Sequence, residues 1–227
     1  MSIISILVSD TDNRSRCSWC GTDPEYIRYH DTEWGIPQHD SQALFEKICL
    51  EGFQAGLSWI TILRRRPAFR HAFYNFDPER VAMMTEADVE RLANDPTIIR
   101  HRGKIAATIA NARATLSLSR PLNDVLWAFA PQQPPKRPSS WADIRTLTKE
   151  STAMSAYLKK AGFRYVGATT LHALMQATGM VDDHFTGCFR ATQEVYSASS
   201  DARRFPGVPF TRGTHNDRLP SAKSVRS

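Results

Sequence analysis

Residues 29–59 read YHDTEWGIPQHDSQALFEKICLEGFQAGLSW, and the rest of the chain is organised around them. Apolar residues between Leu44 and Cys49 recur at the three- and four-residue spacing that places side chains on one face of a helix. Glu51 lies within the same helical pattern, in a stretch that also carries histidines, other acids and two tryptophans. Packing alone does not require this mixture, because carboxylates are seldom buried without a partner. We therefore interpret residues 29–59 as the wall of a pocket.

Helix caps and breakers predict a series of helices along the chain. N-caps are expected at Asp23, Asp40 and Asp77, each of which precedes a helical pattern. Thr85 and Asp88 have the spacing of a capping box, and Gly52 is expected to interrupt the helix that Asp40 begins. Further helices are expected over residues 25–34, 57–63, 105–118, 122–129, 151–160 and 168–178. No alternating strand pattern and no internal repeat accompanies them, so the expected fold class is all-α.

The chain of 227 residues is long enough to bury a substantial core. We expect a core domain over residues 16–189, a loose extension over 1–15 and a basic tail over 190–227, whose Gly, Pro, Ser and Arg content indicates disorder. The tail holds seven Lys or Arg and three acids, so +4 of the net charge of +6 belongs to it. Bulk charge is therefore weak evidence for nucleic-acid binding by the core.

The expected location is the cytoplasm. No apolar run approaches the roughly 18 residues of a membrane span, and the opening MSIISILVSD has neither a basic start nor a small-residue cleavage site. In a reducing compartment the four cysteines favour metal binding or burial over disulfides. We accordingly expect no membrane partner.

Cysteine and histidine recur as two pairs at the two ends of the core. Cys17 precedes His30 by thirteen positions, and His184 and Cys188 are four apart in VDDHFTGC. Two such pairs can provide the four ligands of a tetrahedral Cys2His2 zinc site, which is structural because no coordination position is open. Cys20 is a rival ligand, since it forms a CxxC motif with Cys17. Buried cysteines with unrelated histidines would explain the same spacing.

Aromatic residues and one acid form the candidate pocket. Its members are Trp19, Tyr26, Tyr29, Trp34, Glu51 and Trp59. Flat aromatic faces stack on flat ligands such as a flipped nucleobase, and a buried carboxylate accepts hydrogen bonds from ring N–H groups. The alternative is that the aromatic residues are core and that Glu51 is solvated near a helix end.

Residues 98–105, IIRHRGKI, form a basic turn between two helical segments. Backbone N–H groups at such a turn, with cations beside them, can hold phosphates. The candidate DNA-binding residues there are Arg100, Arg102, Gly103 and Lys104. The alternative is a solvated cluster of charges.

The core from Cys17 to Cys188 resembles the DNA-3-methyladenine glycosylase I family of alkylation-repair enzymes. The matching stretches are YHDTEWG (29–35), LFEKICLEGFQAGLSWITIL (44–63), IIRHRGKI (98–105), GFRYVGATT (162–170) and VDDHFTGC (181–188), which cover about three quarters of the chain in the family's order. The resemblance implies a helix-hairpin-helix glycosylase fold. It also implies a structural zinc that ties the N- and C-terminal segments of the core together. The implied ligands are Cys17, His30, His184 and Cys188, without Cys20.

The resemblance also implies roles for the pocket residues. Glu51 matches the glutamate that hydrogen-bonds the methylated adenine, and Tyr29 and Trp59 match its stacking residues. Trp19 and Tyr26 match further base-binding residues. Leu57 matches a side chain that enters the gap left by the extruded base, and residues 100–104 fall where the DNA backbone is gripped. Asp124 is a downstream acid that we expect to be structural.

The implied activity is base excision by a monofunctional enzyme without lyase activity. Such an enzyme flips 3-methyladenine out of alkylated double-stranded DNA, hydrolyses its N-glycosidic bond and releases the free base. A monomer is expected, because a single damaged base requires one site. The alternatives are a zinc-stabilised damage-binding protein without catalysis and a glycosylase with a shifted base preference. Intact Glu51, Tyr29 and Trp59 argue against the first alternative.

Overall fold

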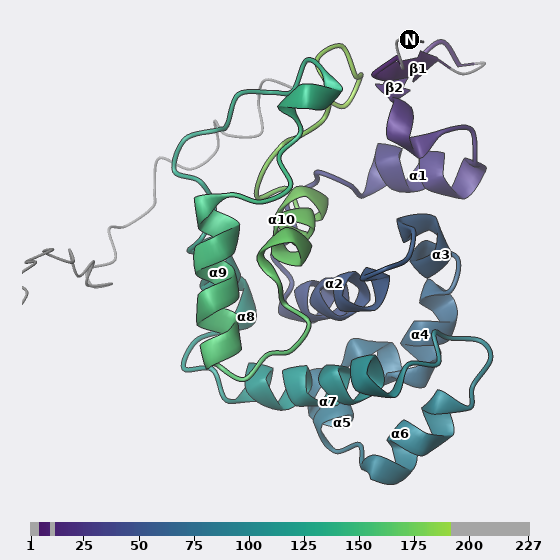
Figure 1. Ribbon diagram of the computed structural model, residues 1–227, viewed down its shortest axis with the longest axis vertical. Coiled ribbons are helices and arrows are strands. Elements are labelled where there is room, and N and C mark those ends of the chain that lie inside the picture. Colours follow the sequence, from purple (N-terminus) through teal and green to yellow (C-terminus); the bar gives the residue numbers. More distant parts are fainter. Residues whose placement is uncertain (1–4, 10–11, 192–227) are drawn as a thin grey trace, which may run out of the picture.

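Helix α2 (Ser41–Gln54) runs through the middle of the molecule in the computed structural model, which describes residues 5–9 and 12–191 (Figure 1). Asp40 caps the helix as predicted, and its carboxylate accepts a hydrogen bond of 2.8 Å from the backbone N–H of Ala43. Every residue from Leu44 to Phe53 is buried. A helix that is buried on all sides must be surrounded by other elements, and α2 therefore organises the core.

Several helices surround α2. It contacts α3 (Trp59–Leu63), the 3-10 turn η2 (Tyr74–Phe76), α7 (Arg102–Leu116), α8 (Leu122–Trp127) and α10 (Ala168–Ala177). Helix α4 (Arg66–Ala72) connects α3 to η2. Two short helices, α5 (Pro78–Ala82) and α6 (Glu86–Ala93), pack on α7. Helix α9 (Lys149–Lys160) packs on α10. Phe53 of α2 lies 4.5 Å from Phe69 between ring centroids, and Phe73 and Phe76 continue the aromatic core.

The capping predictions for the neighbouring helices are confirmed. Helix α1 (Pro24–Thr32) begins after Asp23, whose carboxylate accepts hydrogen bonds from the first turn. Asp77 caps α5 in the same way. The capping box of Thr85 and Asp88 starts α6. These short polar side chains accept from N–H groups that have no partner inside the helix, which fixes where each helix begins.

The predicted interruption at Gly52 is wrong. Helix α2 continues through Gly52 to Gln54 and ends at a turn in which Gly56 has φ of +84°. A Cβ atom at position 52 would lie 3.2 Å from Cβ of Tyr165. Gly52 therefore allows the segment before α10 to approach α2 closely, and the turn at Gly56 supplies the break.

Two short strands correct the all-α expectation to a mostly helical fold. Strand β1 (Leu7–Ser9) pairs antiparallel with β2 (Ser15–Cys17), with Leu7 opposite Cys17, and η1 (Ser18–Cys20) follows directly. Three-residue strands are too short to show readable alternation in the sequence. The sheet and α1 lie at one end of the molecule, and α5 and α6 lie at the other (Figure 1).

Two predictions concern the chain ends and membranes. The predicted disorder of the tail over 190–227 falls almost entirely on residues 192–227, which lie outside the described residues. Within the described part of the chain, no helix has the length and apolar character needed to cross a membrane.

Candidate active site and metal centre

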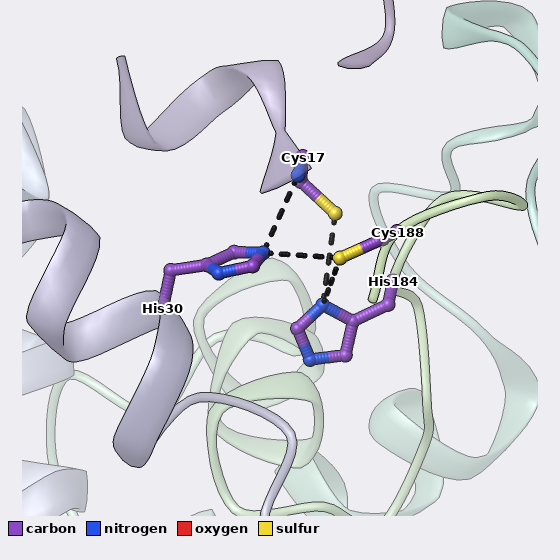
Figure 2. Close-up of side chains that lie close together, drawn as sticks. All are labelled: Cys17, His30, His184 and Cys188. Atoms are coloured by element: carbon purple, nitrogen blue, oxygen red, sulfur yellow. Dashed lines mark hydrogen bonds between the residues drawn. The ribbon is translucent and has the colours of Figure 1, made fainter. Parts of the chain in front are cut away.

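The structure brings the four predicted metal ligands together in a buried cluster (Figure 2). Cys17 ends β2, His30 belongs to α1, and His184 and Cys188 lie in the segment after α10. One ligand atom of each lies within 4.8 Å of all the others. The Sγ of Cys188 is 3.4 Å from Nε2 of His30 and 3.6 Å from Nδ1 of His184, which is also 3.6 Å from Sγ of Cys17.

These separations fit a tetrahedral metal ion. Metal–sulfur and metal–nitrogen distances of about 2.3 and 2.0 Å place tetrahedral ligands about 3.5 Å apart. Two thiols and two imidazoles are the donor set that zinc and related ions prefer. Cys188 is the thiol whose pKa is lowered, because Cys17 donates a hydrogen bond to it and both imidazoles lie beside it.

Outer contacts orient both imidazoles toward the cluster. Nδ1 of His30 is 2.8 Å from Oδ1 of Asp31, which leaves Nε2 facing the cysteines. Asp31 is itself held by Arg16, whose Nη2 donates to Oδ2 at 2.8 Å. Nε2 of His184 is 3.2 Å from the carbonyl oxygen of Trp34, which leaves Nδ1 facing the cluster. Such partners fix the tautomer and the direction of a metal-binding histidine.

The rival ligand Cys20 lies outside this cluster. It is buried, and its Sγ contacts the carbonyl oxygen of Gly21 at 3.8 Å. Cys49 lies in α2 within the hydrophobic core. Within the described part of the chain, Cys20 and Cys49 therefore contribute to packing and not to the metal cluster.

All six residues of the predicted pocket line one cavity of about 260 Å³. Its size approaches the lower end of small-molecule sites, about 300 Å³. The remaining lining residues are Gln54, Trp141, Ile144, Ala173, Gln176, Asp183 and Phe185. Most of the wall is aromatic, and Tyr29 packs against Trp59 with ring centroids 5.4 Å apart.

Two pocket tryptophans also contact the metal cluster. The ring centroid of Trp34 lies 4.6 Å from that of His184, at 89° between the planes. Trp19 lies 5.2 Å from His30 and 5.2 Å from Tyr26. The cluster therefore supports the pocket wall through direct ring contacts.

Two acids line the cavity, Glu51 and Asp183, and Asp183 is paired with Arg145 at 2.8 Å. The side chain of Glu51 is 4% exposed, and no group in the described part of the chain hydrogen-bonds its carboxylate. Burial raises the pKa of Glu51 to about 7, and the ammonium group of Lys47 acts in the opposite direction. A buried, unpaired carboxyl group facing a cavity is available to a ligand that donates hydrogen bonds or carries positive charge.

Lys47 lies one helical turn before Glu51 and beneath the aromatic wall. Its Nζ is 4.6 Å from the ring centroid of Tyr29 and 5.1 Å from that of Trp59. It donates to Oη of Tyr29 at 3.3 Å and pairs with Glu33 at 2.5 Å. Arg66 also binds Glu33, at 2.7 Å, so Lys47 and Arg66 share one carboxylate. Lys47 thus fixes the tyrosine ring and places a cation near Glu51.

The turn after α2 presents Leu57 to solvent. Leu57 is 40% exposed, and its N–H donates to the carbonyl oxygen of Gln54 at 2.6 Å. Nζ of Lys104 donates to the carbonyl oxygens of Phe53 at 2.9 Å and Ala55 at 2.6 Å. This lysine therefore caps the end of α2 and holds the turn.

The basic turn differs from its prediction in two respects. Helix α7 begins at Arg102, three residues earlier than expected, so Gly103 and Lys104 lie in its first turn. Lys104 is buried and bound to carbonyl oxygens, so its predicted contact with a phosphate is not supported. Arg100 and Gly103 are exposed, while Arg102 is half exposed and pairs with Glu86 and Glu90.

A profile of the methyladenine glycosylase family matches residues 19–191. The chain belongs to this family. It is 52% identical over 177 residues to DNA-3-methyladenine glycosylase 1 of Escherichia coli, covering 76% of this chain and 95% of that protein.

Two solved glycosylase structures share the fold of the chain. A crystal structure of 3-methyladenine DNA glycosylase I superposes with a TM-score of 0.75 at 52% identity, covering 77% of this chain and 98% of that one. A structure of the Staphylococcus aureus enzyme, solved to explain 3-methyladenine recognition, gives a TM-score of 0.73 at 37% identity, covering 76% of this chain and 94% of that one.

In this methyladenine glycosylase, Asp124 lies outside the cavity. It is exposed on α8, where Asn123 donates to its carboxylate at 3.0 Å. The sequence did not indicate the wall formed by Trp141, Ile144 and the segment from Asp183 to Phe185. The only available signal was VDDHFTGC, which was interpreted for its metal ligands alone.

Proposed function

We propose that this chain excises 3-methyladenine from alkylated double-stranded DNA as a monomer, releasing the free base and leaving an abasic site. The observation that carries this proposal is the unpaired carboxyl group of Glu51 inside an aromatic cavity. The Escherichia coli relative bears the name of this activity, and the Staphylococcus aureus structure concerns recognition of the same base. Glu51 and the aromatic residues around it would provide the contacts for such a base.

Binding of the base follows from the charge and shape of the cavity. Methylation at N3 gives adenine in DNA a positive charge. The rings of Tyr29 and Trp59 attract a flat cation through their π faces, and Trp19 and Tyr26 extend the aromatic surface. The Glu51 carboxylate accepts hydrogen bonds from the adenine edge and stabilises the cation electrostatically. Unmethylated purines lack the charge and therefore gain less from the same wall.

The bond-breaking step needs little acid catalysis. The bond between N9 and C1′ breaks, and its electron pair neutralises the charge on the departing base. Water forms the new bond to C1′ and releases a proton to solvent. The cavity assists by holding the cationic base and its partly broken bond in place. None of the cavity-lining residues in the described part of the chain is a lysine, which supports hydrolysis without a lyase step.

Exposed residues around the cavity would bind the DNA itself. Leu57, at the tip of the turn after α2, would fill the gap left by the flipped nucleotide. In the helix-hairpin-helix fold that the resemblance implies, the turn between α6 and α7 would face the DNA backbone. Arg100, Arg102 and Gly103 would contact phosphates there, since N–H groups at the start of α7 favour anions.

The metal of the cluster would be a structural Zn²⁺. Cys17, His30, His184 and Cys188 would hold it with no position left for water or substrate. The ion would join β2 and α1 to the segment after α10, and so brace the wall that Trp19 and Trp34 form. It supplies folding free energy and takes no part in bond cleavage.

The test is release of bases from methylated duplex DNA, followed by chromatography, for the wild-type protein and Glu51→Gln. We expect 3-methyladenine from the wild type and little from the variant, which keeps the shape of the side chain but not its charge. Folded, zinc-loaded wild-type protein that binds methylated DNA but releases no base would support a damage-binding protein instead. Comparable release of 7-methylguanine would show a broader base preference.

A further inference from the structure

Trp141 has an unusual position among the residues that line the Glu51 cavity. It belongs to the 3-10 turn η3 (Trp141–Asp143), within the long connection between α8 and α9. Its side chain lines the same cavity as Glu51 and is 43% exposed. The other described lining residues are buried or half-buried; Tyr29 and Trp59, for example, are 2% and 7% exposed. Trp141 therefore lies where the cavity meets solvent.

The loop that carries Trp141 is fixed to the segment after α10. Arg137 pairs with Asp182 at 2.7 Å, and Arg145 pairs with Asp183 at 2.8 Å. Between these ion pairs, the carbonyl oxygen of Pro138 accepts a hydrogen bond of 2.9 Å from the N–H of Thr186. Both ends of the loop are thereby anchored to the wall that also carries two metal ligands.

The turn itself is also ordered by local bonds. Oδ2 of Asp143 accepts four hydrogen bonds of 2.8–2.9 Å from the backbone and hydroxyl groups of Ser139 and Ser140. Trp141 packs against Phe185, with ring centroids 5.0 Å apart at 73°. The indole is therefore held in one place although nearly half of its surface is in water. Such an aromatic group loses little side-chain entropy when a ligand covers it.

We propose that Trp141 is a further base-contacting residue, whose indole packs against the bound cationic methyladenine at the mouth of the cavity. This inference rests on the proposed function and adds an aromatic contact from η3 to those that η1, α1 and α3 provide. An exposed indole gains from being covered by a flat apolar ring, and it attracts a cation more strongly than other aromatic side chains do. The same contact would shield the Glu51 carboxylate from water while the base is bound.

Two substitutions at position 141 separate aromatic contact from simple packing. Trp141→Leu keeps apolar contact with Phe185 but removes the aromatic face, whereas Trp141→Phe keeps a smaller face. Free 3-methyladenine is neutral, so its affinity reports the stacking part of this contact. We expect Trp141→Leu to raise the dissociation constant for the free base about tenfold, and Trp141→Phe to raise it about threefold or less. Calorimetry with the free base gives this constant without DNA. Single-turnover excision from methylated duplex DNA should slow in the same order at subsaturating enzyme.

Tyr157 provides the matched control. It is an exposed aromatic residue on α9, 42% exposed, and packs against Phe129 away from the cavity. Tyr157→Leu should bind the base and excise it as the wild type does. Metal content and melting temperature of each variant show whether the wall next to Phe185 remains intact.

The outcomes distinguish this inference from the proposed function. Wild-type affinity for the base in folded Trp141→Leu would overturn the inference while leaving the glycosylase activity in place. Weaker DNA binding with unchanged affinity for the free base would overturn it too, because Trp141 would then contact DNA outside the cavity. A wild-type protein that neither binds nor releases 3-methyladenine would overturn the proposed function itself.

Discussion

The ammonium group of Lys104 donates a hydrogen bond of 2.6 Å to the carbonyl oxygen of Ala55. This contact joins the first turn of α7 to the turn that carries Leu57. A second bond of 2.9 Å to Phe53 completes the cap of α2. The basic turn and the exposed leucine are thus parts of one rigid unit, so a DNA backbone bound at α7 lies at a fixed distance from the side chain proposed to enter the duplex.

Replacement of Lys104 by Met tests this clamp. We expect the free energy of unfolding to fall by about 1–3 kcal/mol, because two buried carbonyl oxygens lose a charged donor. DNA affinity should fall as the Leu57 turn loosens, while affinity for free 3-methyladenine stays unchanged. The number of phosphate contacts should also stay the same, so the slope of log affinity against log salt should match the wild type. Arg100→Ala, by contrast, should reduce that slope by about one.

A change of slope in Lys104→Met equal to that in Arg100→Ala would show that Lys104 reaches a phosphate. Lys104→Arg should restore part of the stability, because its guanidinium can donate to the same two carbonyl oxygens. Titrations at several salt concentrations and denaturant melts of the three variants provide the comparison.

Glu51 should make the protein less stable as the pH rises. Its pKa is raised from 4.5 to about 7 in the folded protein, so burial opposes its ionisation. The protonated form favours folding fully below the unfolded pKa, and this contribution is lost as pH rises through the folded pKa. Glu51→Gln cannot ionise. Its advantage in free energy of unfolding over the wild type should therefore grow by about 2–3 kcal/mol between roughly pH 5 and pH 8.

Denaturant unfolding of both proteins at the two pH values measures this difference, and effects of pH on the metal cluster are common to both proteins and cancel. An advantage that does not change with pH would show that the Glu51 carboxyl is as well solvated as in the unfolded chain. The same variant is expected to lose excision. The Glu51 carboxylate would then lower the stability of the folded protein while being required for excision.

The sequence predicts well those parts of the site that depend on residue chemistry. Two cysteines and two histidines indicate a metal site wherever the fold brings them together, and the cluster confirms that grouping. The aromatic residues and Glu51 likewise share one cavity, as predicted. The sequence did not reveal which way individual side chains point. From the sequence alone, Lys104 could equally have faced solvent. In the structure it binds the carbonyl oxygens of Phe53 and Ala55, which lie about 50 positions earlier in the chain.

The wall formed by Trp141 and Ile144 could not be predicted from the sequence either. Its position depends on ion pairs that Arg137 and Arg145 form with Asp182 and Asp183, about 40 positions later in the chain. No local pattern encodes these long-range ion pairs. The same holds for Gly52, whose role comes from Tyr165 packing against it rather than from its helix propensity.

Lys47 is expected to hold the pKa of Glu51 near 7, so that part of the Glu51 population is ionised at neutral pH. Its charge lowers the pKa of Glu51 against the effect of burial, and Lys47→Met removes that charge. Excision by the variant should therefore need a higher pH, with the acid limb of the pH–rate profile displaced upward. Other ionisable groups around the carboxyl are Tyr26 and Tyr29, whose pKa values burial raises, so they remain neutral in this range. Single-turnover rates between about pH 6 and pH 9 give the profile.

A uniform loss of rate at every pH would instead show that Lys47 acts only by holding Tyr29. Affinity for the free base separates these roles further, because a displaced Tyr29 ring weakens binding even where Glu51 is fully ionised. Lys104→Met is a suitable control. It also removes a buried lysine, but this lysine binds the carbonyl oxygens of Phe53 and Ala55 and does not shift the pKa of Glu51, so the acid limb should stay in place.

Metal analysis should find one zinc ion per chain, bound by the cluster. Cys17→Ser should lose the metal and lower the free energy of unfolding by more than about 3 kcal/mol, because metal binding contributes directly to folding. Cys20→Ser is a matched control: it changes a buried cysteine three residues away that lies outside the cluster, and should keep the metal. Equal metal content in both variants would contradict the assignment of ligands.

Removal of the metal tests whether its role is structural. If the ion only braces the wall formed by Trp19 and Trp34, metal-free protein should lose excision in step with its folded fraction, measured by circular dichroism at the same temperature. A catalytic ion would behave differently, since chelation would then abolish excision while the fold remained. Because four protein ligands leave no position for water or substrate, we expect the first behaviour, with activity per folded molecule retained until the wall itself loosens.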